Sequence, residues 1–219
     1  PPHYTCPIAA TALLCHASAM AQCRYIGGRW LNAVALAVWC AGCSTTVVLQ
    51  PSDMPVTARA QFLSQGKRFY VDRVKPPPLD NKNIGVTRSL AGRFWSRIKS
   101  DDDLSAYAAE EIRRFLVRHK QSIVSSPELA DCLIQCDIRK LTVTKKYDWI
   151  WDDEFTSSVE LVVSFRDRVS GRVLRSQNVE QDVFMERDYD DNETVSDEQM
   201  LSRCLSSAFA QALEKLSVP

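Results

Sequence analysis

The most constraining feature of the sequence is the long strand-like alternation of apolar and polar residues between residues 131 and 186. In residues 155–166 the two kinds of side chain alternate almost without interruption, which places one kind on each face of a β-sheet. Residues 131–145 and 172–186 show the same period, the first with a predicted bulge near its centre. Gly171 provides the turn between the last two segments. The sequence therefore predicts a three-stranded antiparallel meander.

Two other segments have the period of an amphipathic helix. Residues 104–120 carry apolar side chains three or four positions apart, and three aspartates directly before them favour a helix N-terminus. Residues 196–216 show a second apolar stripe of the same kind. Ser196 and Gln199 have the spacing of a capping box, which predicts that this helix begins there.

These segments predict one domain over residues 68–219. A short β-favouring run at residues 68–75 is stopped by three prolines, and residues 81–100 are ambiguous. The expected fold class is α+β: a mainly antiparallel sheet, made of the short first strand plus the three-stranded meander, with two amphipathic helices packed on one face. A composition of 45% hydrophobic and 25% charged residues is ordinary for such a domain.

The first 42 residues have a different composition from the rest of the chain. They contain no acidic residue, and Arg24 and Arg29 precede an apolar stretch at residues 30–40. A stretch of that length is too short to span a hydrocarbon core of about 30 Å as a helix. Residues 1–42 are therefore predicted to be a signal peptide region, with Met20 as the expected natural start.

The apolar stretch ends in a short cysteine motif. Ala41, Gly42 and Cys43 resemble the end of a bacterial lipobox, although Cys40 stands where that motif usually has Leu. The resemblance implies that acyl chains are attached to the Cys43 sulfur and anchor the protein to a membrane. Ser44, rather than Asp, at the next position implies retention at the outer membrane, on its periplasmic face.

Other interpretations of this region remain open. An uncleaved membrane anchor over residues 26–48, a Cys40–Cys43 redox or metal pair, and a buried helix of the domain are all compatible with the apolar stretch. The polar residues that follow, with two prolines and no regular period, predict a flexible tether over residues 43–67. Such a coil would span about 25–30 Å.

The sequence offers little that points to chemistry. The net charge is zero, so no general attraction to nucleic acid is expected. His119 is the single histidine after Cys43, and the acidic loop at residues 188–193 fails the EF-hand spacing, so we expect no metal. Seven glycines leave no phosphate-binding loop, and we expect no cofactor.

The remaining cysteines are expected to be core thiols. Cys132 and Cys136 are about 13 Å apart along a strand, too far to pair with each other. Whether either of them pairs with Cys204 is left open by the sequence.

One loop has the composition of a contact surface. Trp149, Ile150 and Trp151 lie between two predicted strands, where large apolar side chains are costly to expose. They either contact a partner or tuck under the domain, and Trp95 could join either group. We therefore take these three residues as the possible partner contact.

The order of elements, with the lipobox and the run Phe165-Arg-Asp-Arg-x-x-Gly-x-Val-Leu174, resembles that of small bacterial envelope lipoproteins. The YajG-like lipoproteins and the auxiliary lipoproteins of ABC-type lipid transporters are similar in this respect. The resemblance implies a non-enzymatic interaction or assembly accessory in the periplasm, with an envelope protein as partner. It supplies no catalytic residue.

Two alternative functions are kept. A lipid-anchored hydrolase would use paired carboxylates from Asp152, Asp153, Glu154 or residues 188–193, facing each other across a cleft at about 5–10 Å. A carrier of lipid or another small ligand would have a continuous apolar cavity between the sheet and the helices.

Overall fold

The computed structural model describes residues 44–50, 60–62, 66–78, 82–89, 92–147, 153–187 and 195–219. The chain divides into two compact units, Pro1–Gly42 and Cys43–Pro219, and every described residue belongs to the second unit. The predicted signal region and Cys43 itself lie outside the described residues.

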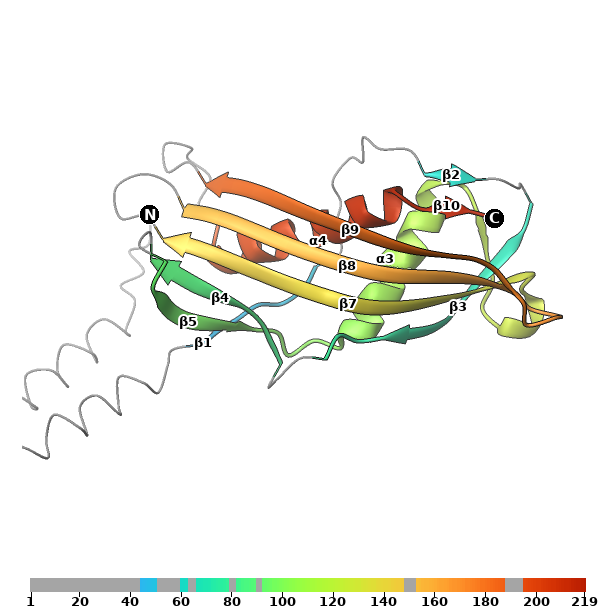
Figure 1. Cartoon of the computed structure of the whole chain (residues 1–219), viewed down its shortest axis with the longest axis horizontal. Coiled ribbons are helices and arrows are strands. Elements are labelled where there is room, and N and C mark those ends of the chain that lie inside the picture. Colours follow the sequence, from blue (N-terminus) through green and yellow to red (C-terminus); the bar gives the residue numbers. More distant parts are fainter. Residues whose placement is uncertain are drawn as a thin grey trace, which may run out of the picture. The chain divides into compact units, whose positions relative to one another are not determined.

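Three long strands form one side of the sheet, from the edge strand β9 to the central strand β7, and they have the predicted antiparallel order (Figure 1). They are β7 (Cys132–Tyr147), β8 (Asp153–Asp167) and β9 (Val173–Arg187). The register of β7 against β8 shifts between Ile138 and Lys140, which is the bulge that the sequence indicates. Gly171 has a positive φ of 66° in the turn between β8 and β9.

The prediction of a mainly antiparallel sheet with one short first strand was wrong. Among the described residues, eight strands form one mixed sheet, and β7 has parallel neighbours on one edge. The first half of β7 pairs with β3 and its second half pairs with β4. Beyond them, β5 pairs with β4, β1 pairs with β5, and β6 pairs with β3. β3 (Arg68–Lys75) is the predicted short strand, and the strands that were not predicted are β1 (Ser44–Thr46), β4 (Asn83–Ser89), β5 (Phe94–Lys99) and β6 (Ser122–Ile123).

The error has a physical reason. Alternation along a strand reports which face is buried, but it does not report which distant strand lies beside it or in which direction that strand runs. The parallel partner of Phe69 is Cys132, more than sixty positions later, and that of Gly85 is Val143. Parallel neighbours require long crossover connections, for which short-range patterns give no signal.

The first residues of the predicted tether, 44–50, are paired with the domain, while residues 51–59 and 63–65 of that segment lie outside the described residues. β1 pairs in parallel with β5, and the Val47 amide donates to the Lys99 carbonyl at 2.8 Å. The Leu49 amide donates to Asp102 Oδ2 at 2.7 Å, and Val47 and Leu49 are buried. Residues 44–50 are therefore part of the folded domain, although three consecutive apolar residues are too few to show a strand period.

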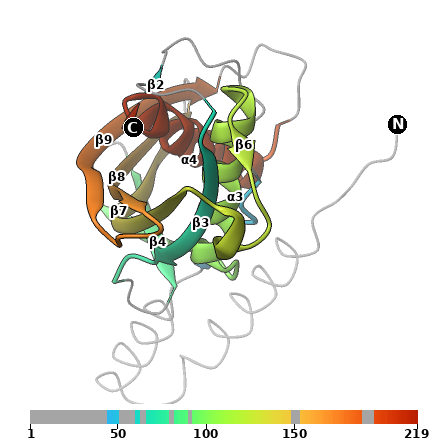
Figure 2. The ribbon, with the colours of Figure 1, turned by 90° about the vertical axis from the view of Figure 1, so that its right-hand side faces the viewer.

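Two helices cover one face of the sheet, and Figure 2 shows the sheet curving around them. They are α3 (Leu104–Arg118) and α4 (Asp197–Glu214). The Asp103 side chain accepts from the first backbone amides of α3, and the capping box predicted at Ser196 and Gln199 is confirmed. α4 packs on β8 and β9, while α3 packs on β3.

One hydrophobic core fills the space between the sheet and the helices. Its largest fully buried side chains come from all layers, among them Phe69, Phe115, Phe155, Phe165 and Phe209. Short elements complete the described structure: β2 (Gln61–Phe62) pairs in parallel with β10 (Ser217–Val218), and η1 (Pro127–Leu129) precedes β7. The loops at one end of this layered structure carry the candidate surface.

Candidate interaction surface

The predicted site residues lie outside the described residues, but the strands that flank them in the sequence are described. Trp149, Ile150 and Trp151 lie outside the described residues, in the connection between β7 and β8. Cys43 directly precedes β1. Neither prediction is tested by the described structure, but the residues that flank both segments are described and can be examined.

A network of four charged side chains, of which Lys145 and Asp153 are buried and Asp197 is partly exposed, lies at the end of the sheet where β7 ends and β8 begins. Lys145 Nζ is 2.7 Å from Asp153 Oδ2 and 2.6 Å from Asp197 Oδ2. Arg187 pairs with the same two carboxylates, contacting Asp153 Oδ2 and approaching Asp197 Oδ1 at 2.8 Å. The Lys145 and Asp153 side chains are 6% and 0% exposed. Both cations lie 5.7 Å from the centre of the Phe155 ring, which forms the floor of the network.

The network joins the bases of two loops. Lys145 and Asp153 flank the β7–β8 connection at residues 148–152, which contains the predicted contact residues. Arg187 and Asp197 flank the β9–α4 connection at residues 188–194. Two carboxylates balance two cations, so the network carries no net charge. Removing one member would leave buried charge without its partner, which is costly in a low-dielectric interior.

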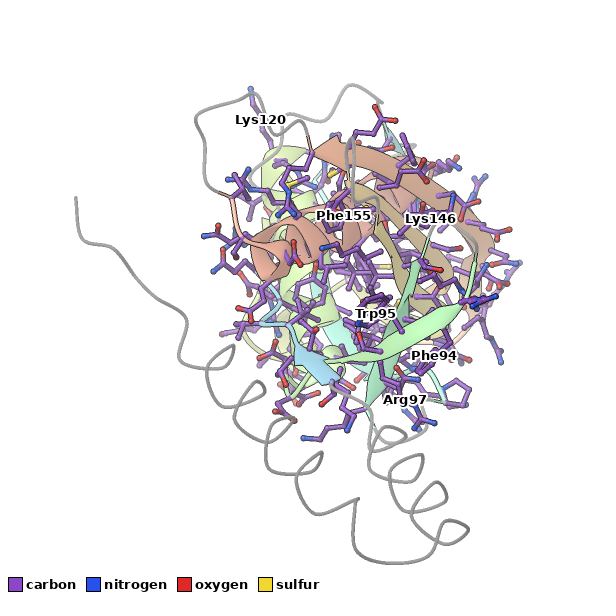
Figure 3. The ribbon with its side chains drawn as sticks, turned by 90° about the vertical axis from the view of Figure 1, so that its left-hand side faces the viewer. Phe94, Trp95, Arg97, Lys120, Lys146 and Phe155 are labelled. Carbon is purple, nitrogen blue, oxygen red and sulfur yellow. The ribbon has the colours of Figure 1, made fainter. Side chains whose placement is uncertain are left out.

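The β4–β5 hairpin presents a second feature at the same end. Residues 82–99 contain five basic residues and no acidic residue. Phe94 and Trp95 are 56% and 55% exposed, unusually high values for such large apolar side chains. Figure 3 shows Phe94, Trp95 and Arg97 close together on β5. Arg93 and Arg97 are also exposed, so the hairpin has a surface that is both basic and aromatic.

This surface was missed in the sequence because the hairpin lies in the segment judged ambiguous. Its strand pairing shifts register between Thr87 and Arg88, where Trp95 is the extra residue, and this shift interrupts the alternation. A detectable signal did exist in the sequence. Eighteen consecutive positions without a single acid are conspicuous in a chain with equal numbers of acidic and basic residues.

Gly85 holds this hairpin against the central strand. A Cβ atom at Gly85 would lie 1.8 Å from the Val143 carbonyl oxygen of β7, so no other residue fits without moving one of the two backbones. This close approach is a backbone requirement of the kind that glycine alone satisfies in a strand.

The paired carboxylates of the hydrolase alternative are not arranged as that function requires. Asp153 is buried against Lys145 and Arg187 instead of facing a cleft. Glu154 pairs with Lys146 Nζ at 2.7 Å. Asp152 and residues 188–193 lie outside the described residues. Asp153 and Glu154 therefore form ion pairs at this end of the sheet.

His119 has the structural role expected of it at the end of a helix. It is the C-cap residue of α3, and its Nε2 lies 2.8 Å from Glu214 Oε2. The Glu214 side chain is buried and also accepts from the Ala60 amide at 3.2 Å. This contact fastens α3 to the end of α4. Within the described ranges, no three or more His, Cys, Asp or Glu side chains are grouped so that they could hold a metal ion.

The three described cysteines are separate buried thiols, so none of them forms the disulfide that the sequence left open. Burial raises the pKa of Cys132 to about 11 and that of Cys136 to about 12. Burial also raises the pKa of Cys204, whose Sγ lies 3.4 Å from the Ser157 hydroxyl. Because the thiolate is the reactive form, these groups are poor nucleophiles.

The structure shows a hollow on the face of the sheet that points away from the helices. Its position does not fit the carrier alternative, which requires an apolar cavity between the sheet and the helices. Most of the side chains around it are polar or charged; the lining residues are Arg73, Lys75, Gln135, Cys136, Asp137, Val162 and Ser164. None of the helices in the described part of the chain is long and apolar enough to cross a membrane.

Comparisons with known proteins give a fold resemblance alone. No family model matches the sequence, and no curated protein is significantly similar to it. A Xanthomonas campestris protein of family DUF330 matches with 12% identity and a TM-score of 0.39, over 78% of this chain and 90% of that one. A Helicobacter pylori homolog of the neuraminyllactose-binding hemagglutinin matches with 10% identity and a TM-score of 0.35, over 72% and 87%.

A third similar structure is a lipoprotein of Neisseria meningitidis, with 9% identity and a TM-score of 0.27, over 59% of this chain and 86% of that one. The similar structures therefore include a lipoprotein and a homolog of a binding protein. At these identities and scores they assign neither a family nor an activity to this chain.

Proposed function

We propose that this chain is a lipid-anchored accessory protein of the bacterial cell envelope, which acts by binding a protein partner and not by catalysis. The observation that carries the proposal is the order of segments around Cys43. An acid-free, signal-like segment ends in Ala41, Gly42 and Cys43, and the folded domain begins at the next residue, Ser44. This is the arrangement expected where a signal is removed and the new first residue carries acyl chains.

The proposed partner contact is the β7–β8 connection with Trp149, Ile150 and Trp151. Its support is the network of charged side chains at its base, because Lys145 and Asp153 fix both ends of this loop. Aromatic residues on a rigid base are the usual centre of a protein interface. The proposed location is the periplasmic face of the outer membrane, on the basis of Ser44 after Cys43.

Mass spectrometry of the membrane fraction after expression in a bacterium tests the anchor. The expected N-terminal peptide of the wild-type chain begins at Cys43 and carries the added mass of acyl chains. The Cys43→Ala variant should lack that mass and leave the membrane fraction, whereas Cys40→Ala should behave as wild type. A wild-type peptide that starts at unmodified Met20 or further upstream would contradict the proposal.

Affinity capture from solubilised envelopes tests the loop. Changing Trp149 and Trp151 together to Ala should reduce recovery of the partner at least tenfold, as expected for the loss of interface anchors worth about 1.4 kcal/mol or more. Phe184→Ala is the matched control, since Phe184 is a 54% exposed aromatic on β9. Equal recovery with the loop variant and the control would show that the loop is not the contact.

A further inference from the structure

We infer that the basic and aromatic β4–β5 hairpin is a docking surface for an anionic bilayer, which holds the anchored domain in a fixed orientation. The inference rests on the proposed function for the presence of a bilayer beside the domain. It goes beyond that function because it assigns a second, protein-based membrane contact to residues with no role in the lipid anchor.

The first argument is the position of the anchor relative to the hairpin. Ser44 pairs with Arg97 across β1 and β5, and neighbouring strands lie about 4.8 Å apart. Because β1 runs parallel to β5, the chain enters β1 from the side of β5 that begins with Phe94. Cys43 is one peptide unit, about 3.8 Å between Cα atoms, before Ser44. Acyl chains on Cys43 would therefore enter a bilayer beside Phe94 and Trp95.

The second argument is the chemistry of the hairpin surface. Aromatic rings are favoured at the boundary between headgroups and hydrocarbon, where Trp in particular is enriched. Basic side chains near an anionic bilayer contribute about 1 kcal/mol each. The hairpin combines both, with exposed Phe94 and Trp95 between exposed Arg93 and Arg97. Among the described residues, Lys82 pairs with Asp101, while no ion pair with a described acid involves Arg93 or Arg97.

The third argument is the contrast with the opposite end of the same sheet. The β8–β9 turn exposes the aliphatic side chains of Val173 and Leu174, and basic residues outnumber acidic ones around it: Arg166, Arg168, Arg172 and Arg175 lie near Asp131 and Asp167. Both ends are therefore basic, but the hairpin adds exposed aromatic rings and lies where Ser44 enters the sheet. A bilayer is thus the occupant that matches the charge, the aromatic side chains and the place where the anchored residue joins the domain.

The test uses the fluorescence of Trp95 in the processed, lipidated chain. Trp149→Phe and Trp151→Phe leave Trp95 as the single tryptophan after residue 43. The protein is bound to phosphatidylcholine vesicles that contain a minor fraction of phosphatidylglycerol, with or without bromine on the acyl chains. Brominated lipid should quench Trp95 strongly. The matched control combines Trp95→Phe with Leu174→Trp, which places the indole at the opposite end, and should remain unquenched.

Charge gives the second readout. Changing Arg93 and Arg97 together to Gln should lower the ratio of docked to undocked protein about thirtyfold, which corresponds to about 1 kcal/mol for each basic residue. Changing Arg172 and Arg175 to Gln at the opposite end should leave quenching of Trp95 unchanged. Replacing the anionic lipid with phosphatidylcholine alone should also reduce the quenching.

The outcomes separate the two proposals. Vesicle-bound protein whose Trp95 emission is the same with plain and brominated lipid would overturn the inference and leave the lipid anchor intact. Emission that responds to single-stranded oligonucleotide or to an envelope protein, and not to vesicles, would also overturn it. If the chain carries no acyl mass, the proposed function fails. Membrane contact of the hairpin is then tested by the same quenching measurement on the Cys43→Ala chain, with Trp30 and Trp39 also changed to Phe.

Discussion

The two ends of the long β7–β8–β9 sheet differ in whether their charged side chains are buried or exposed. At the end with Lys145 and Asp153, charged side chains are buried while aromatic side chains of the neighbouring hairpin are exposed. At the other end, the Arg68–Asp131 ion pair is 50% and 42% exposed, as is normal for a soluble domain. Burying charged side chains is costly unless each keeps its partner, so the fold at the first end depends on its ion pairs more than the fold at the other end does.

The largest expected effect comes from the buried charges. Asp153→Ala should lower the free energy of unfolding by about 3–5 kcal/mol, because Lys145 and Arg187 then remain buried with one carboxylate between them. Asp131→Ala at the opposite end should cost far less, since its ion pair is exposed to solvent. Denaturant unfolding followed by circular dichroism measures both. Equal losses would remove the contrast between the two ends.

A smaller effect is expected where the hairpin meets the central strand. Gly85→Ala should destabilise the domain by about 1–3 kcal/mol, because the added methyl group collides with the Val143 carbonyl. The loss should be local, with faster hydrogen exchange at β4 and β5 than at β8 and β9. Gly92→Ala is the control, since a Cβ there meets nothing within 4 Å, although its positive φ adds some strain. Uniform exchange across the sheet would argue against a separately held hairpin.

The exposed aromatic residues should contribute little to folding. Phe94→Ala and Trp95→Ala are each expected to lower the free energy of unfolding by no more than about 1 kcal/mol, because more than half of each side chain is exposed. Phe165→Ala, at a fully buried position, should cost about 3–5 kcal/mol in the same assay. A large loss from Trp95→Ala would mean that its ring supports the fold and that its exposure has no functional reason.

The smallest effect concerns acid stability at the opposite end. Hydrogen bonds from Arg68 lower the pKa of Asp131 from 3.8 to about 2. A carboxyl with a lowered folded pKa stabilises the protein above its unfolded pKa, and this contribution is lost as the pH falls from about 3.8 through 2. The pH titration of Asp131 by nuclear magnetic resonance should give this low midpoint, and Arg68→Gln should return it towards 3.8. A midpoint near 3.8 in the unchanged protein would show that the pair does not form in solution.

The parts of the fold that were predicted correctly are those with a local signal. The bulge in β7, the turn at Gly171 and the capping box at Ser196 each depend on residues within a few positions of one another. The parallel pairing of β3 and β4 with β7 depends on contacts between distant segments, and no local pattern encodes it. The strands of the β4–β5 segment were not predicted, because its bulge and its exposed aromatic residues interrupt the alternation of apolar and polar residues.

The candidate surface was predictable to a similar extent. Composition alone pointed to the β7–β8 loop and to Cys43, and both remain predictions. The network of Lys145, Asp153, Arg187 and Asp197 could not be foreseen, because its members come from four separate elements that the sheet and α4 bring together. The basic hairpin could have been found by examining charge in windows instead of over the whole chain.

The incorporation of residues 44–50 into the sheet determines how far an anchored domain could travel. A long flexible linker would let the domain take up a wide range of positions and orientations above the membrane surface. Because Val47 and Leu49 are buried in the core, a lipid attached to Cys43 would leave the domain no such freedom. A protein held in this way would meet its partners by lateral diffusion in the plane of the membrane, and would present the same face of the domain at every encounter.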